Sequence, residues 1–128
     1  LMQAKFKDMP KSMGYVGENL AIKYLIDKGY EILDKNFTVR GGEIDIVARK
    51  NGVFIFVEVK ARTSDSFGEG NESVDRQKKK RILYAAEKYL YTKIKTPDPD
   101  FRLDIIEIEL DPETGAQKNI NHFEDIEV

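Results

Sequence analysis

The sequence contains no cysteine, and it has a single histidine, His122. Without cysteine, the chain has no disulfide scaffold, no thiolate zinc site and no cysteine nucleophile. A single histidine argues against a His-rich metal site and against a Ser-His-Asp triad. A metal bound by this chain would therefore be held by oxygen atoms, which favours magnesium, manganese or calcium.

The sequence also lacks a long apolar run and a strong excess of one charge. No stretch is apolar enough for a signal peptide or a membrane span, so a cytoplasmic protein without membrane contacts is expected. The net charge of −2 argues against a protein that coats nucleic acid, because such proteins neutralise many phosphates with Lys and Arg. It leaves room for an enzyme with a local basic patch. A chain of 128 residues is expected to form one domain, 1–128.

Hydrophobic periodicity predicts a helix, three strands, a second helix and a further strand. Helical spacing over 14–28 ends at Gly29, and a second helical pattern covers 74–94. Strand patterns occupy 30–39, 43–49, 53–60 and 101–110, the polar segment 61–73 indicates a long exposed loop, and a weak strand is expected after the turn DPETG. The predicted fold class is therefore α/β, with an αβββαβ order and a mixed sheet flanked by helices.

The Asn-Gly pair at 51–52 is the strongest short hairpin signal in the chain. If this pair forms a two-residue turn, the register places Asp45 opposite Glu58 and Glu43 opposite Lys60. Because side chains alternate along a strand, these four residues share one face. The other face then carries only apolar side chains, which supports the register: Ile44, Ile46, Ala48, Ile55, Val57 and Val59.

Two carboxylates opposed across a hairpin repel one another, since their Cβ atoms lie about 5 Å apart. Asp45 and Glu58 therefore need a bound cation, or one of them must hold a proton. A hard divalent ion satisfies the first alternative, with Lys60 supplying a second positive charge. The other interpretation is a solvated sheet end that carries a Glu43–Lys60 surface ion pair and no chemistry.

Glu18 lies inside the apolar arc of the first helix and is expected to point toward the sheet. One interpretation is a hydrated carboxylate that interacts with the helix macrodipole. The other is a third metal ligand that the helix brings to the carboxylate pair, because an unpaired carboxylate is rarely buried.

The second predicted helix begins with a basic run, 78–81, most of which is interpreted as a solvated face. Lys78 is the exception, because its helical position aims the ammonium over the carboxylates. Arg62 follows Lys60 at strand spacing and is a candidate phosphate ligand. The segment 61–73 is either a connector or a substrate-binding loop. His122 is expected to have an ordinary surface or partly packed role, and core and surface packing on the helix is expected for the tyrosines at 84, 89 and 91.

The segments GEID (42–45) and VEVK (57–60) together resemble the active-site signature of the PD-(D/E)xK nuclease superfamily. In that pattern, Asp45 stands at the aspartate and Glu58 and Lys60 form the ExK. Glu18 matches the helix glutamate of the branch that resembles Holliday-junction resolvases. The segments GYVGENLAIKYL, NFTVRGGEIDIVA and FVEVKAR are more narrowly similar to the bacterial YraN family. The resemblance covers about 14–110 and implies a restriction-endonuclease-like core.

The resemblance implies a metal-dependent endonuclease that hydrolyses DNA, with RNA left open as the alternative and with branched, structured and linear substrates all open. Its catalytic residues would be Asp45, Glu58 and Lys60. The two acids would bind Mg²⁺ or Mn²⁺ with Glu18 as a further ligand, and Lys60 would orient the attacking water or neutralise charge on the phosphate. The basic residues Arg62 and Lys78 would bind flanking phosphates.

The chain departs from the superfamily pattern at two places. Ile44 replaces the proline, and Arg81 stands where RecB-like exonucleases have the tyrosine of Gln-x-x-x-Tyr, which puts an exonuclease in doubt. Two rival classes stay open: a nucleic-acid-binding module without turnover, and a protein-interaction module with a structural acidic cluster. A homodimer is also left open.

Overall fold

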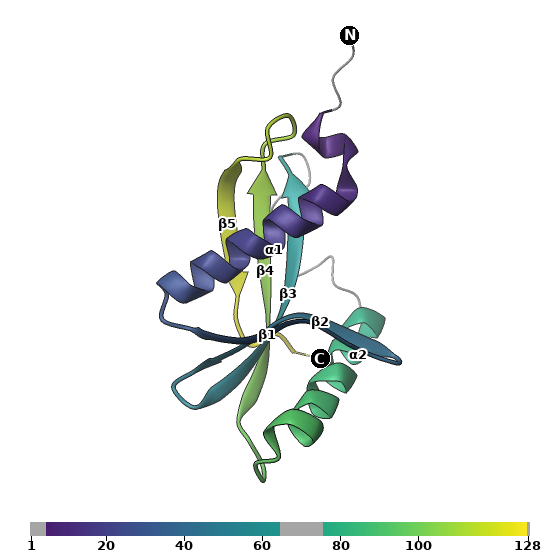
Figure 1. Ribbon diagram of the computed structural model, residues 1–128, viewed down its shortest axis with the longest axis vertical. Helices are drawn as coiled ribbons and strands as arrows, with labels where there is room; N and C mark the ends of the chain where they lie inside the picture. Colours follow the sequence, from purple (N-terminus) through teal and green to yellow (C-terminus); the bar gives the residue numbers. More distant parts are fainter. Residues whose placement is uncertain (1–4, 65–75, 128) are drawn as a thin grey trace.

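The computed structural model describes residues 5–64 and 76–127, and it shows a twisted sheet with a helix on each face (Figure 1). A short 3-10 helix, η1 (Phe6–Asp8), precedes α1 (Pro10–Asp27). The strands β1 (Glu31–Val39), β2 (Gly42–Lys50) and β3 (Val53–Thr63) follow. The helix α2 (Arg76–Tyr89) continues into the π-helical segment η2 (Leu90–Ile94), and the last strands are β4 (Phe101–Leu110) and β5 (Gln117–Phe123).

The five strands of the described residues form one sheet in the order β1-β2-β3-β4-β5. Neighbouring strands are antiparallel except β3 and β4, which are parallel and are connected through α2. The predicted αβββαβ core is therefore confirmed, with β5 as the weak strand expected after the DPETG turn. In the parts of the chain that the structure describes, no helix is both long and apolar enough to cross a membrane.

Two apolar clusters lie on opposite faces of the sheet, so both faces of β2 and β3 are buried. Under α1 are the side chains of Ala21 and Leu25 from the helix, with Ile46, Ala48, Ile55, Val57, Ile106 and Ile108 from the sheet. Under α2 are Ile82, Ala85, Ala86 and Tyr89 from the helix, with Ile44, Val47, Phe54, Phe56, Leu103 and Ile105 from the sheet. The sequence expectation that Ile44 shares a face with Ile46 is therefore wrong, and regular alternation along β2 is broken at Asp45.

Several element boundaries differ from the predicted ones. The helix α1 begins at Pro10, four residues early, because proline is well suited to the first turn of a helix. Strand β3 continues through 61–63, which were predicted as loop, because these residues pair with Ile108–Leu110 of β4. Residues 65–73 of the predicted loop and residues 74–75 of the predicted helix lie outside the described residues.

Two glycines allow the helices to approach the sheet closely. A Cβ on Gly17 would lie 2.8 Å from the Cβ of Ala61, so α1 sits directly on β3 and brings Glu18 to the sheet surface. A Cβ on Gly42 would collide with the carbonyl oxygen of Arg81, so the first half of α2 packs against the start of β2. Together these two contacts bring both helices to the end of the β2–β3 hairpin that carries the acidic residues.

Candidate active site

The β2–β3 hairpin has the register that the Asn-Gly turn predicted. Its pairs run from Lys50↔Val53 to Ile46↔Val57, and one further step along that register sets Asp45 opposite Glu58. Regular pairing stops there because Asp45 replaces a backbone acceptor: the Val59 amide donates a hydrogen bond to Asp45 Oδ2 at 2.8 Å. The Asp45 carboxylate is thus fixed at the end of the ladder, next to Glu58.

Glu58 is the buried acid of the site, with 5% of its surface exposed. Burial, and then the neighbouring charge of Asp45, raise its pKa to about 7, against the lowering effects of Lys78 and Lys60. Its Oε1 lies 3.6 Å from the Nζ atoms of both lysines. Its Oε2 is buried and has no hydrogen-bond partner among the described residues. A buried oxygen of this kind is rare, because desolvation without a partner costs free energy, and it indicates a missing proton or cation.

Lys78 reaches the carboxylates from the first turns of α2, as its helical position predicted. Its Nζ lies 2.9 Å from Glu43 Oε1, to which it donates a hydrogen bond, and 3.6 Å from Glu58 Oε1. Burial alone would lower the pKa of Lys78, but the hydrogen bond to Glu43 and the charges of Glu58, Glu43 and Asp45 together raise it. The alternative interpretation, with a Glu43–Lys60 ion pair, is not what the described residues show: Glu43 pairs with Lys78, which approaches from the α2 face, and Lys60 pairs with Glu58.

Glu18 approaches the same carboxylates from α1. Burial and the charge of Asp45 raise its pKa, while a hydrogen bond from Asn36 lowers it. The Asn36 side chain donates to Glu18 Oε1 at 2.9 Å from a left-handed backbone position, φ 52°, which asparagine tolerates better than most residues. Glu18, Asp45 and Glu58 thus lie around one end of β2, although their oxygens do not all fall within 4.8 Å of one another.

Arg62 is anchored by an acid that sequence reasoning missed. Its Nε lies 3.2 Å from Glu107 Oε2, and the Glu107 side chain is fully buried. Glu107 pairs with Lys60 in the parallel β3–β4 register, next to the position of Arg62. Its signal in the sequence is the alternation IIEIEL at 105–110, in which two acids, at 107 and 109, have the same spacing as the two basic residues at 60 and 62.

The donor set fits a hard divalent cation. The carboxylates of Asp45, Glu58 and Glu18 are the oxygen ligands that Mg²⁺ and Mn²⁺ prefer, and the unpartnered Glu58 Oε2 is the atom that such an ion would satisfy. Lys60 and Lys78 set positive charge beside these acids without occupying that oxygen. The arrangement can therefore hold a cation and an anionic group next to each other.

A second group of possible metal ligands lies elsewhere in the sheet, where Asp104, His122 and Glu124 have ligand atoms within 4.8 Å of one another. Arg102 already bridges the two carboxylates, with Nε 3.0 Å from Asp104 Oδ1 and Nη2 2.8 Å from Glu124 Oε1. His122 Nε2 lies 2.8 Å from Asp104 Oδ2, and the Asp125 amide donates to Asp104 Oδ1. Because the guanidinium supplies the positive charge, this group holds the C-terminal segment on β4, and His122 is partly packed as expected.

The sequence is similar to those of a known protein family. The profile of the Uncharacterised protein family UPF0102 matches residues 17–108, a span that includes every candidate site residue from Glu18 to Lys78. The chain belongs to the UPF0102 family. It is 44% identical over 114 residues to a UPF0102 protein of Caldanaerobacter subterraneus subsp. tengcongensis, covering 88% of this chain and 92% of that relative. A UPF0102 protein of Clostridium perfringens strain SM101 is 49% identical, over 80% of this chain and 83% of that relative. A UPF0102 protein of Alkaliphilus oremlandii is 43% identical, over 91% of this chain and 97% of that relative. The resemblance to the YraN family, which is this UPF0102 family, is thereby confirmed.

Proposed function

We propose that this UPF0102 protein is a metal-dependent phosphodiester hydrolase that acts on DNA as an endonuclease. The observation that carries the proposal is the buried Glu58 carboxylate, which faces Asp45 and has one oxygen without a hydrogen-bond partner in the described part of the chain. Two lysine ammoniums within 3.6 Å of its other oxygen provide the positive charge that a phosphate diester requires.

In the proposed site, Asp45 and Glu58 would hold Mg²⁺ or Mn²⁺, and Glu18 would be a further ligand, directly or through water. When bound, the ion supplies charge stabilisation at the scissile phosphate and a lower pKa for the attacking water. The hydrogen bond from the Val59 amide keeps Asp45 in its position. Lys60, half-buried and tied to Glu58, orients the water or neutralises charge that develops on the phosphate.

Flanking phosphates are assigned to Lys78 and Arg62. Lys78 is held by Glu43 and Glu58, and Arg62 by the buried Glu107, so both cations are fixed before substrate arrives. A pre-positioned cation gains more from a phosphate than a flexible surface lysine, because less side-chain entropy is lost on binding.

A thermal melt with and without Mn²⁺ tests the metal site. A ligand that binds only the folded state raises its stability by mass action, by about 2.7 kcal/mol at a hundredfold excess over Kd. Mn²⁺ at millimolar concentration is expected to raise the Tm of the wild type and of Asp27→Ala, an exposed acid on the same α1 helix as Glu18, by several degrees. Asp45→Ala is expected to show no shift.

Cleavage assays separate chemistry from metal binding. Lys60→Gln is expected to keep the Mn²⁺ shift in Tm and to lose roughly 10²–10³-fold in cleavage rate, because a positioned charge is removed from the transition state. A wild type that cleaves neither branched nor linear DNA, combined with DNA binding that Asp45→Ala leaves intact, would favour the binding-module class instead. A melt that Mn²⁺ does not alter, combined with a higher Tm for Asp45→Ala, would favour a structural acidic cluster.

A further inference from the structure

Two large aromatic side chains point into solvent from the second helix. Tyr84 on α2 is 44% exposed and Tyr91 on η2 is 82% exposed, whereas Tyr89 between them is buried. Of the core and surface positions expected from the sequence, Tyr89 takes the core position, and Tyr84 and Tyr91 lie at the surface. Exposed aromatic rings that neighbour one another often mark a binding surface, because a ligand that covers the rings gains the free energy of removing them from water.

These tyrosines belong to a regular pattern of cations and rings. Arg81, Tyr84 and Lys88 follow one another at spacings of three and four residues on one flank of α2. Tyr91 follows in η2, and Lys95 is the left-handed residue (φ 58°) directly after η2. We call these five residues the cation–tyrosine stripe. The Lys88 ammonium lies 5.5 Å from the centre of the Tyr84 ring, so these two members of the stripe lie side by side in space.

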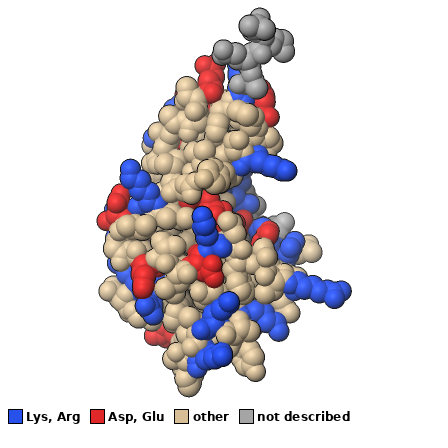
Figure 2. All heavy atoms as spheres, viewed as in Figure 1, with Lys and Arg blue, Asp and Glu red and all other residues tan. Residues whose placement is uncertain are grey.

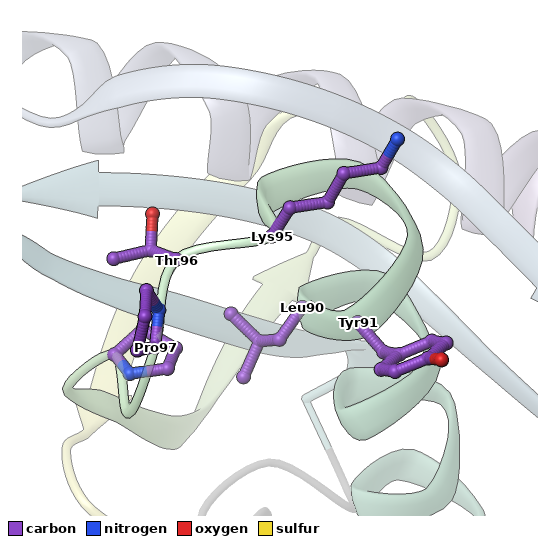
Figure 3. Close-up of a pocket in the computed structure, with 6 residues that line it drawn as sticks. Leu90, Tyr91, Lys95, Thr96 and Pro97 are labelled. Atoms are coloured by element: carbon purple, nitrogen blue, oxygen red, sulfur yellow. The ribbon is translucent and has the colours of Figure 1, made fainter.

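The stripe borders two surface hollows. Tyr84, Lys88 and Tyr91 line one of about 370 Å³ together with Glu87. Tyr91 and Lys95 line a second, of about 550 Å³, with Leu90, Thr96, Pro97 and Pro99. Figure 3 shows Leu90 between the Tyr91 ring and the Thr96–Pro97 segment, with Lys95 projecting beside them. Each hollow therefore has an aromatic wall and a cation beside it.

The stripe leads away from the candidate active site. Lys78, at the start of α2, touches Glu43 and Glu58, and Tyr84 lies beside the β1–β2 turn, where a Cβ on Gly41 would be 3.5 Å from its ring. At about 1.5 Å of rise per residue, Tyr84 lies about 9 Å and Tyr91 about 20 Å along the helix from Lys78. Figure 2 shows Lys and Arg side chains gathered over the α2 side of the molecule.

We propose that the cation–tyrosine stripe binds an unpaired nucleic-acid strand, with bases stacked on Tyr84 and Tyr91 and phosphates on Arg81, Lys88 and Lys95. The alternation of ring and cation matches the alternation of base and phosphate along a single strand. Bases in a duplex are already stacked on each other, so a duplex cannot use the rings. The stripe carries three cations in a chain of net charge −2, which concentrates the attraction for phosphate here.

This inference deepens the proposed function: it makes the substrate a DNA with a single-stranded segment next to the cleaved bond. The position of the cleaved bond rests on the proposed function. Binding of a single strand to the stripe requires no metal and can be tested without it.

Fluorescence anisotropy in EDTA tests the stripe with a labelled 20-nucleotide oligothymidine and a labelled duplex of the same length. The double variant Tyr84→Ala/Tyr91→Ala is expected to bind the single strand at least tenfold more weakly and the duplex within about twofold of wild type. Tyr84→Phe/Tyr91→Phe keeps the rings and is expected to bind like wild type. Tyr15→Ala, which removes a ring that is 70% exposed on α1, is the matched control and should change nothing.

Charge is tested separately by the salt dependence of single-strand binding. Lys88→Gln/Lys95→Gln is expected to reduce the slope of log affinity against log salt by about 1.4, since each neutralised phosphate contributes about 0.7. An unchanged affinity in the double alanine variant, or an equal loss for single strand and duplex, would overturn the proposal. In EDTA, Asp45→Ala should bind the oligothymidine like wild type. A failure of the proposed cleavage activity is therefore distinguishable from a failure of single-strand binding by the stripe.

Discussion

At the scale of single residues, Glu58 carries a charge that its buried surroundings disfavour. Its carboxylate is buried beside Asp45, and two lysines reduce the cost of its charge without removing it. The unfolded chain exposes the same group to water, where its pKa is the ordinary 4.5. Glu58 therefore couples the stability of the fold to pH.

We predict that the metal-free protein loses stability between pH 4.5 and pH 8. The pKa of Glu58 is raised to about 7 in the folded state, so its contribution is fully present below the unfolded value and is lost as pH rises through about 7. The shift corresponds to at most about 3 kcal/mol. Urea denaturation in EDTA across this range measures the loss, and Glu58→Gln is expected to flatten the profile and to be more stable than wild type at pH 8.

Glu43→Gln is the control for that measurement, because Glu43 is exposed enough to be hydrated and its pKa is lowered through its hydrogen bond and ion pair with Lys78. This variant should keep the loss of stability between pH 4.5 and pH 8. An identical slope in wild type and Glu58→Gln would show that another group carries the pH dependence.

At the scale of secondary-structure elements, the contact between α1 and β3 determines where Glu18 lies. The helix backbone approaches the strand at Gly17, where the nearest atom to an added Cβ is the Cβ of Ala61. That neighbour is short and attached to the backbone, so it cannot rotate away. The spacing between helix and sheet is therefore fixed by the smallness of these two residues.

We predict that Gly17→Ala destabilises the protein by about 1–3 kcal/mol, although alanine is the better helix former, because the added methyl overpacks the interface. Gly14→Ala is the matched control on the same helix: nothing lies within 4 Å of its Cβ, so this variant should be neutral or stabilising. Ala61→Gly removes the opposing methyl and should restore part of the stability of Gly17→Ala. Chemical denaturation of the four proteins checks the set, and equal stability of Gly17→Ala and Gly14→Ala would contradict it.

At the scale of the whole molecule, the central strands join the two apolar clusters into one structure. Strand β2 gives Ile46 and Ala48 to the cluster under α1 and Val47 to the cluster under α2, and β3 alternates in the same way. Neither cluster can lose its sheet face while the other keeps it. The two halves of the core are therefore expected to unfold together.

We predict a single cooperative unfolding transition. Far-UV circular dichroism, which reports the helices, and tyrosine fluorescence, which reports rings on both faces, should give coincident midpoints in urea. Tyr24 lies on the α1 side and Tyr89 on the α2 side, so Tyr24→Phe and Tyr89→Phe variants separate the two signals. Two distinct midpoints would show that the clusters are independent.

Sequence reasoning succeeded where a local rule determines the geometry. The Asn-Gly turn fixes the hairpin register and hence the approach of Asp45 to Glu58, and helical spacing points Lys78 at the acids. It failed where partners come from distant segments. The Arg62–Glu107 pair depends on the parallel β3–β4 register, and the contact between Asn36 and Glu18 depends on a left-handed residue in β1. The IIEIEL alternation marks Glu107 but not its partner, and the contact between Asn36 and Glu18 has no local signal in the chain.

The order in which the site residues occur along the chain has a consequence for biosynthesis. The acids of the site all lie within residues 18–58, so they leave the ribosome before Lys78 does. Until α2 has been made, Lys60 is the counter-charge that the hairpin itself supplies to Glu58. The arrival of Lys78 adds the second, at 3.6 Å from Glu58 and 2.9 Å from Glu43. Before α2 is made, the acid of the hairpin therefore has one cation of the final pair, and the second is supplied only by a later segment of the chain.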